Sequence, residues 1–312
     1  MSMEGKTNLF GIDFDRPVIM NGAGSAKTIE ELEILVKSSV AIPMIGTITI
    51  PQREGNAGET FWADDWHSLN SVGLRNLGAP YYSQYLPEMV YIAHNAGKLL
   101  AVSVAGFSPK EYAILTKLVF EKKADLVELD LGCANIWENG EQEHIACFDP
   151  VLLKQILKIV EESVGTQVKV VAKLSPFSDP FLLKEIAKII SQFEMIKAVT
   201  TTNTFPNCLD FDEKGKPRTT PAGGLAAMGG GALRPIALGQ VKQLRSFLPE
   251  SIDLIGVGGI SGRRDTGGKH IEDFEQAGAK AVQITTPLLI RPPGAWPQVF
   301  TDLVISYAEL KE

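Results

Sequence analysis

The feature that most constrains the fold of this chain is an alternation of short apolar segments, rich in β-branched residues, with longer amphipathic segments. The alternation repeats about eight times, and the apolar segments carry few polar residues, which is typical of strands buried on both faces of a parallel sheet. The amphipathic segments between them are typical of crossover helices. The pattern therefore predicts an α/β fold, a (β/α)8 TIM barrel. Its predicted strands span residues 17–20, 42–45, 99–104, 126–131, 169–173, 198–202, 254–257 and 281–284.

Several of the amphipathic segments begin with helix-start signals. Thr28 and Glu31 have the spacing of a capping box, and Asp149 stands directly before Pro150, a favoured first residue of a helix. Barrels of this length are common and no linker-like tract divides the chain, so we expect one domain over residues 1–312. Predicted helices span residues 28–38, 109–122, 149–163, 180–193, 235–247 and 270–277.

Charge and cysteine usage narrow the class of function. A formal net charge of -7 disfavours binding to nucleic acid or to an anionic membrane, because both need a basic surface. No stretch of about 18 apolar residues occurs, and residues 1–8 hold no apolar run, so we expect a cytoplasmic protein that acts on a small molecule. The cysteines, Cys133, Cys147 and Cys208, lack the paired spacing of a zinc or iron–sulfur site, so no metal is expected and the thiols should be reduced.

Four connections are longer than a barrel needs, and each follows a predicted strand. In a barrel, the segments that follow strands gather at the C-terminal face, where the active site of this fold lies. We therefore expect extended loops and the functional site at that face. The four connections span residues 49–81, 134–148, 205–234 and 261–269.

Glycines and hydroxyls follow the seventh and eighth predicted strands, the places where barrels commonly bind a phosphate. Gly256, Gly258 and Gly259 let backbone N–H groups approach phosphate oxygens, and Thr285 and Thr286 add hydroxyl donors. Such glycines also occur simply in tight turns, but their position after the seventh strand favours a phosphate site. A further cluster at residues 229–231 precedes a helix start and fits the same anion-binding geometry.

Cys133 and Lys173 follow or end the fourth and fifth predicted strands. A thiol at a strand end can act as a base once its surroundings adjust its pKa. A buried lysine needs an anionic partner, and the N1–C2=O edge of a reduced flavin is one, although Lys173 could also be a solvated strand-end charge.

Three asparagines, Asn70, Asn135 and Asn203, stand after strands in the same part of the predicted barrel. An amide side chain both donates and accepts hydrogen bonds, which suits a cyclic amide or imide whose ring edge alternates N–H and C=O groups. A single asparagine at such a place is more often a turn residue, but three of them beside a cysteine and a lysine favour a substrate site.

These residues are also where the chain resembles a known family, the dihydroorotate dehydrogenases, and within it the soluble class 1 that uses cysteine as base. The resemblance runs from about residue 21 to residue 287. It is most specific in Arg53-Glu-Gly-Asn56 and in Asn70-Ser-Val-Gly-Leu-Arg-Asn-Leu-Gly78, the latter closer to the homodimeric, fumarate-linked branch than to the branch with an iron–sulfur partner subunit. Asn203-Thr204 resembles the family's Asn-Ser pair and, in its threonine, the dihydropyrimidine dehydrogenases.

The resemblance implies an oxidoreductase of pyrimidine biosynthesis that holds FMN, oxidises dihydroorotate to orotate and passes the electrons to a second acceptor such as fumarate. Cys133 would remove a proton from C5 while the flavin takes a hydride from C6. Catalytic roles fall on Cys133 and Lys173. Substrate binding falls on Asn70, Gly73, Leu74, Asp130, Asn135, Asn203 and Thr204. FMN binding falls on Ala23, Gly24, Thr47, Lys173, Thr202, Gly230, Gly258, Gly259, Thr285 and Thr286.

Two positions depart from the family pattern. Gly46 stands where the family has a lysine that binds the orotate carboxylate, and Asp130 stands where it has an asparagine. Together they make the site more negative by about two charges, which is unfavourable for an anionic substrate. Arg75 is a candidate replacement for the missing cation. The alternatives are a flavoenzyme that acts on another dihydropyrimidine-like cyclic amide, and a barrel that binds a ligand without catalysis.

Overall fold

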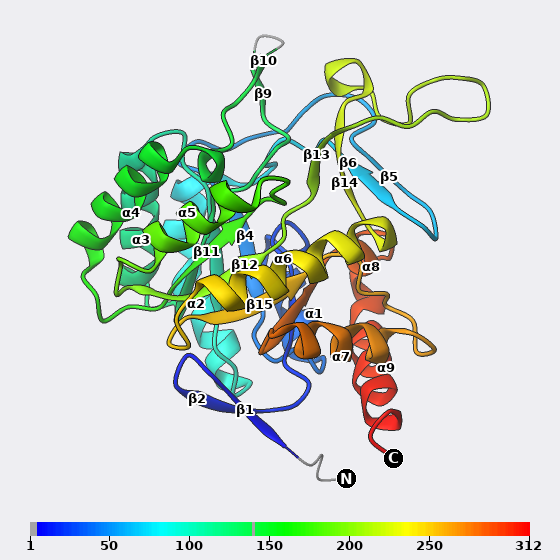
Figure 1. Cartoon of the computed structure of the whole chain (residues 1–312). Coiled ribbons are helices and arrows are strands. Elements are labelled where there is room, and N and C mark those ends of the chain that lie inside the picture. The colour runs from blue at the N-terminus through cyan, green and yellow to red at the C-terminus, as the bar shows by residue number, and fades with distance from the viewer. Residues whose placement is uncertain (1–4, 139–140) are drawn as a thin grey trace.

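The computed structural model describes residues 5–138 and 141–312 and shows a closed parallel barrel (Figure 1). From the second barrel strand on, each strand pairs in parallel with the next along the chain, and the last pairs with the first. An isolated parallel bridge between Met20 of the first strand and Ile42, just before the second, closes the barrel. All eight predicted strands are present, so the predicted fold is confirmed. The strands are β3 (Ile19–Asn21), β4 (Met44–Ile48), β7 (Ala101–Val104), β8 (Leu126–Asp130), β11 (Val170–Leu174), β12 (Ile196–Thr201), β15 (Asp253–Val257) and β16 (Ala281–Ile284).

Helices surround the barrel, and the predicted start signals hold. The Thr28 side chain and Glu31 form a capping box, and the Asp149 side chain accepts hydrogen bonds from two backbone N–H groups of the helix that follows. The six predicted helices are α1 (Ile29–Val36), α3 (Pro109–Glu121), α4 (Pro150–Val164), α5 (Pro180–Ile190), α6 (Arg234–Phe247) and α7 (Gly267–Ala277). The sequence did not single out α2 (Gly78–Asn95), α8 (Thr286–Leu289) or α9 (Trp296–Glu309). In α2, Pro87 lies inside the helix and weakens its local signal.

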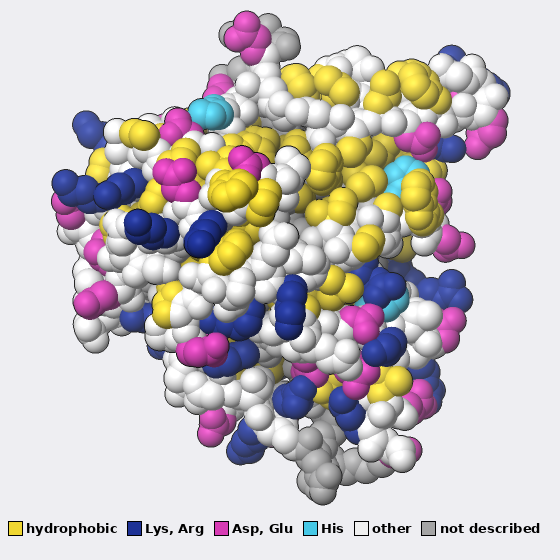
Figure 2. Space-filling view, in the orientation of Figure 1, with side chains coloured by type: hydrophobic (Ala, Val, Ile, Leu, Met, Phe, Trp, Pro, Cys, Tyr) yellow, Lys and Arg dark blue, Asp and Glu magenta, His cyan; other side chains and the backbone are white. Residues whose placement is uncertain are grey.

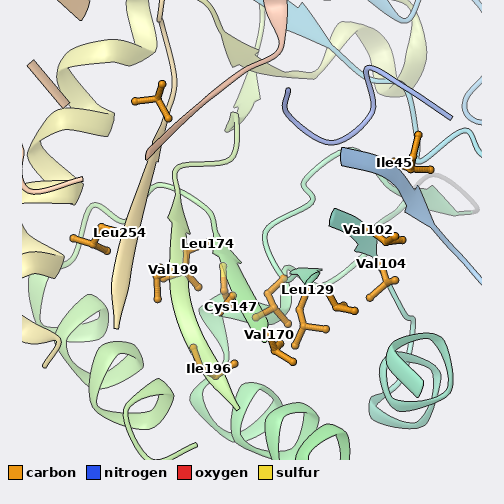
Figure 3. Packing of buried hydrophobic residues seen from close by; sticks show 14 of the residues in the cluster. Ile45, Val102, Val104, Leu129, Cys147, Val170, Leu174, Ile196, Val199 and Leu254 are labelled. Carbon is orange, nitrogen blue, oxygen red and sulfur yellow. The ribbon is translucent and has the colours of Figure 1, made fainter. Parts of the chain in front are cut away.

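Two apolar cores result from the alternation of side chains along the strands. Val170 and Leu129 point outward and pack in the large core between the barrel and its helices (Figure 3). Val171 and Leu126 point inward and fill the lower half of the barrel. The hairpin of β1 (Lys6–Leu9) and β2 (Ile12–Asp15) adds Leu9 to this inner core and lies at the end of the barrel opposite the long connections (Figure 1).

The long connections at the C-terminal end contain regular structure of their own. Four short strands form a second sheet in the order β13-β14-β6-β5, in which β14 pairs antiparallel with β6. Its strands are β5 (Phe61–Ala63), β6 (Ser68–Asn70), β13 (Phe205–Cys208) and β14 (Ala226–Gly229). The connection at residues 134–148 carries β9 (Trp137–Glu138), β10 (Glu141–Gln142) and a 3-10 turn (Ala146–Phe148).

Residues 139 and 140 of that connection, and the first four residues of the expected single domain, lie outside the described part of the chain. Within that part, none of the helices combines the length and the apolar character needed to span a membrane.

Candidate functional site

A cavity of about 400 Å³ lies at the C-terminal end of the barrel. Every residue to which the sequence assigned a role in catalysis, substrate binding or FMN binding lines this cavity, and so does Arg75. The structure thus brings the predicted site together in one place, while the roles of the individual residues remain predictions. The face of the molecule in Figure 2 carries acidic and basic side chains interspersed, and hydrophobic side chains gather across its upper part.

Cys133 is the only one of the three cysteines on the cavity wall. It follows β8, and burial together with the nearby Asp130 carboxylate raises the pKa of its thiol to about 12. Cys147 is fully buried in the outer core (Figure 3), where its sulfur accepts a hydrogen bond from the backbone N–H of Ser175. Cys208 is partly buried on β13. Of these thiols, only that of Cys133 can therefore reach a ligand in the cavity.

Lys173 on β11 points into the barrel at the floor of the cavity and is only 5% exposed, so the alternative of a solvated strand-end charge is wrong. Its Nζ lies 3.3 Å from Oε1 of Glu128, which is 1% exposed. The other oxygen of Glu128 accepts hydrogen bonds from Thr200 Oγ1 at 2.8 Å and from Gln283 Nε2 at 2.7 Å. These four side chains, which we call the polar layer, come from four strands and separate the apolar interior from the cavity.

Asp130 ends β8 and is buried in the cavity wall. Its Oδ1 accepts a hydrogen bond of 2.9 Å from Asn203 Nδ2, and its Oδ2 lies 3.4 Å from Thr47 Oγ1. Burial raises the pKa of this carboxyl group, Lys173 opposes that rise, and Glu128 adds to it. The site therefore presents a buried acceptor where the family has an amide.

Two of the predicted asparagines, Asn70 and Asn135, lie in one hydrogen-bonded group. The Asn135 amide donates to Asn70 Oδ1, and the Asn70 amide donates to the backbone oxygen of Ala227 at 3.2 Å. Asn56, in the first motif of the family resemblance, donates to the backbone oxygen of Asn135 at 3.0 Å. The second sheet and the loop after β8 thus hold these amides in fixed orientations.

Gly46 cannot carry a longer side chain in this backbone. Its φ is +115°, and a Cβ atom would lie 2.5 Å from the backbone oxygen of Ser103. Two backbone hydrogen bonds, from Gly24 N to Gly46 O at 2.7 Å and from Gly46 N to Ala26 O at 3.1 Å, hold the loop after β3 against it. The next residue of that loop, Lys27, lines the cavity. A cation is thus present beside the position where the family has its lysine.

The ammonium group of Lys27 is partly buried and donates to the backbone oxygen of Gly24 at 2.5 Å. Burial lowers the pKa of this group, Glu31 raises it, and Arg75 lowers it further. Arg75 is exposed and its Nε donates to the backbone oxygen of Glu54 at 3.0 Å. The sequence analysis named Arg75 as the replacement cation and missed Lys27. A signal was available, because Lys27 follows the predicted FMN-binding residue Gly24 by only three positions.

The opposite end of the cavity is built from glycines and hydroxyls. Gly258 and Gly259 have φ values of +126° and +77°, and a Cβ on Gly259 would lie 2.8 Å from the backbone oxygen of Gly230. Thr286 Oγ1 lies 3.1 Å from Ser68 Oγ of the second sheet. This end offers backbone and hydroxyl groups of the kind that hold a phosphate.

Other lining residues were not predicted. Gln283 is the most informative, because it lines the cavity and its buried Oε1, without a hydrogen-bond partner among the described residues, is available to accept from a ligand N–H group. A charged or amide side chain in the middle of a buried strand was the available signal. Within the described ranges, no group of three or more His, Cys, Asp and Glu side chains is placed to hold a metal ion. The further unpredicted lining residues include Thr60, Phe61, Ser68, Val72, Leu233 and Leu289.

Comparison with known proteins places this site in a family. The model of the family "Dihydroorotate dehydrogenase" matches residues 5–305. A putative dihydroorotate dehydrogenase A (fumarate) of Streptococcus agalactiae is 30% identical over 302 residues, which cover 96% of this chain and 92% of that protein. The dihydroorotate dehydrogenase A (fumarate) of Lactococcus lactis subsp. lactis is 29% identical over 306 residues, with 96% and 92% covered.

A solved structure of DHODH from Eimeria tenella in complex with ferulenol matches with a TM-score of 0.76 at 18% identity. The match covers 96% of this chain and 83% of the Eimeria chain. At 18% identity this likeness supports the fold alone. The matches to proteins named as fumarate-linked enzymes confirm the resemblance predicted from the sequence: the chain belongs to the dihydroorotate dehydrogenase family.

Proposed function

We propose that this protein oxidises dihydroorotate to orotate with FMN as cofactor and Cys133 as base. The observation that carries the proposal is the meeting of Cys133 and Lys173, from the ends of the neighbouring strands β8 and β11, on one cavity ringed by amide side chains. A thiol can remove a proton from the substrate carbon, and an ammonium can balance negative charge on the cofactor.

The glycine-rich end of the cavity fits the phosphate of FMN, and the unpartnered Gln283 Oε1 fits an N–H group of a flavin ring. Gly24 in the cavity wall supports the same fit. A Cβ atom there would meet no protein atom within 4 Å, so the wall leaves open space for the cofactor at this position. When bound, FMN supplies the acceptor for the hydride. Lys173 would lie against the ring, and Gly230, Gly259 and Thr286 would hold the phosphate.

The substrate would bind among Asn70, Asn135, Asn203 and Asp130. The amides can donate to ring carbonyls and accept from ring N–H groups, whereas ionised Asp130 can only accept. A dihydroorotate ring has N–H groups that suit such an acceptor. Lys27, held beside Gly46, would bind the carboxylate and so restore the charge that Gly46 removes.

Cys133 must lose its proton before it can act as base. Because burial and Asp130 raise its thiol pKa to about 12, the thiolate is scarce at neutral pH. Substrate oxidation should therefore accelerate as the pH rises toward that value. The proton that Cys133 takes from the substrate must leave to solvent before the next turnover.

The named relatives support fumarate as the second substrate, because their names specify it. We also propose a homodimer, which rests on the family resemblance alone, and a cytoplasmic location, which rests on the sequence pattern described above. Sedimentation of the purified protein measures its oligomeric state and so tests the homodimer.

The test is a visible spectrum followed by anaerobic titration with dihydroorotate. We expect a yellow protein whose flavin bands bleach on addition of dihydroorotate and return with fumarate, with orotate as product. Full flavin loading without bleaching would contradict the proposed substrate. A colourless protein that takes up no FMN would instead support a barrel without catalysis.

A second candidate is oxidation or reduction of an uncharged dihydropyrimidine. Asp130 favours it, since a buried carboxylate repels an anionic ligand. Binding of uracil and of orotate to the oxidised protein, followed by the change in the flavin spectrum, separates the two. Tighter binding of orotate would exclude this candidate.

A further inference from the structure

The polar layer contains a buried carboxylate, Glu128, whose purpose the proposed reaction does not explain. Lys173, Glu128, Thr200 and Gln283 are each at most 5% exposed, and two of them carry formal charges. Buried ion pairs seldom stabilise a fold more than apolar residues of similar size would, because both charges lose their hydration. An arrangement of this kind at the floor of a cavity therefore suggests a role for the ligand above it.

We propose that Glu128, held by Thr200 and Gln283, is a positioning residue that fixes the place and the charge of the Lys173 ammonium and thereby sets the reduction potential of the bound flavin. This inference rests on the proposed FMN site. It adds a role for Glu128 and Thr200, to which the proposed chemistry gave none, and a second role for Gln283.

The hydrogen bonds explain how Glu128 is held. Both neutral donors, Thr200 Oγ1 and Gln283 Nε2, bind the same carboxylate oxygen, Oε2. Oε1 has no hydrogen-bond partner among the described residues and lies 3.3 Å from Lys173 Nζ. The carboxylate is thus fixed with its free oxygen toward the ammonium, and it draws Nζ to one position in the floor of the cavity.

The charges explain what Glu128 does to Lys173. Burial lowers the pKa of the ammonium group, whereas Glu128, then Asp130 and Cys133, raise it, and the net direction is upward. All three of these titratable groups lie on or just after β8, while the neighbours from β12 and β16, Thr200 and Gln283, do not titrate. Glu128 is the largest favourable influence, so without it burial would promote loss of the proton.

The charge of Lys173 matters to a flavin because reduction adds negative charge to the ring. A fixed ammonium near that charge stabilises the reduced state and raises the reduction potential. If the ammonium loses its proton in the oxidised state, reduction must bring that proton back. The potential then falls more steeply with pH.

The test compares the flavin midpoint potential of the wild type with that of Glu128→Gln between about pH 6 and pH 9. In the variant we expect a range in which the reduction equilibrium changes by an additional tenfold per pH unit, about 30 mV for two electrons. The wild type should lack this extra slope. Parallel profiles for the two proteins would overturn the proposal.

Two further variants locate the effect and keep the test decisive. In Glu128→Gln with Lys173→Met no titrating group remains in the polar layer, so the extra slope that comes from Lys173 should disappear. Glu128→Asp keeps the charge but moves it away from Lys173 by the length of one methylene group. Its midpoint potential should show the extra slope at a higher pH than that of Glu128→Gln. If Glu128→Gln does not retain flavin, an unchanged profile in Glu128→Asp overturns the inference. A wild type that binds no flavin would count instead against the proposed function.

Discussion

The two ends of the cavity are built in different ways. At the end formed by Gly230, Gly259 and Thr286, the wall consists of backbone and hydroxyl groups, and close approaches between backbone segments fix its shape. At the other end, Cys133 and Asp130 bring ionisable side chains, and the Asp130 carboxylate together with burial raises the pKa of the Cys133 thiol. A backbone wall tolerates few substitutions, whereas side chains can be exchanged one at a time.

The difference explains where this chain departs from its family. Both departures, Gly46 and Asp130, lie at or beside the end built from side chains, and a cation from another loop, Lys27, accompanies them. The end proposed to hold the FMN phosphate keeps its predicted glycines. Changes at the two ends should therefore have separable effects, on chemistry and ligand choice at one end and on cofactor retention at the other.

Cys133→Ala should separate the ends most strongly. Loss of the base should slow flavin reduction by dihydroorotate by roughly 10²- to 10⁴-fold, the usual contribution of general base catalysis, while the flavin content stays unchanged. Stopped-flow bleaching measures the rate. Cys208→Ala is the matched control, because that thiol lies on β13 away from the cavity, and it should leave the rate unchanged. Equal rates in both variants would remove Cys133 from the mechanism.

Lys27→Met should weaken binding of orotate by roughly tenfold to a hundredfold, because a hydrogen bond to a charged group contributes about 1.5–3 kcal/mol. Binding of uncharged uracil should change little. Arg75→Met should have a smaller effect, since Arg75 is exposed. Spectral titration of the oxidised protein gives the dissociation constants. An equal loss of affinity for orotate and for uracil would show that Lys27 does not bind the carboxylate.

Gly259→Ala should affect retention of the cofactor, in contrast to the variants at the other end of the cavity. Its φ of +77° and the backbone oxygen of Gly230 at 2.8 Å leave no room for a Cβ, so the wall must shift at a cost of about 1–3 kcal/mol. We expect loss of flavin on gel filtration and a lower free energy of unfolding. Gly97→Ala, at a φ of +71° with nothing within 4 Å of the added Cβ, controls for backbone strain alone. A fully loaded Gly259→Ala protein would refute the close-packed wall.

Asp130→Asn should have the smallest effect, a several-fold change in rate. Removal of the carboxylate takes away a charge that raises the pKa of Cys133, so that pKa falls and more thiolate is present at neutral pH. The pH profile of flavin reduction should move to lower pH, and orotate should bind more tightly. A profile displaced to higher pH would contradict the electrostatic account.

The sequence predicted the barrel because each strand carries its own local signal, a short apolar segment followed by a helix. Cys133 and Lys173 were also predictable, since their place at strand ends follows from the same pattern. The polar layer was not, because Glu128 and Gln283 are 155 residues apart and meet only in the closed barrel. The same holds for the second sheet, in which Ala227 pairs with Asn70 across 157 residues.

The second sheet joins the two ends of the cavity. Its strand β6 carries Asn70 and Ser68, and its strand β14 ends at Gly229, next to Gly230. In the proposed function, one hydrogen-bonded sheet thus contributes to the pockets for both the cofactor and the substrate. A change in the position of this sheet would act on both pockets, and any effect of one ligand on the affinity for the other must be reciprocal. Comparison of the dissociation constant of FMN with and without orotate measures this coupling.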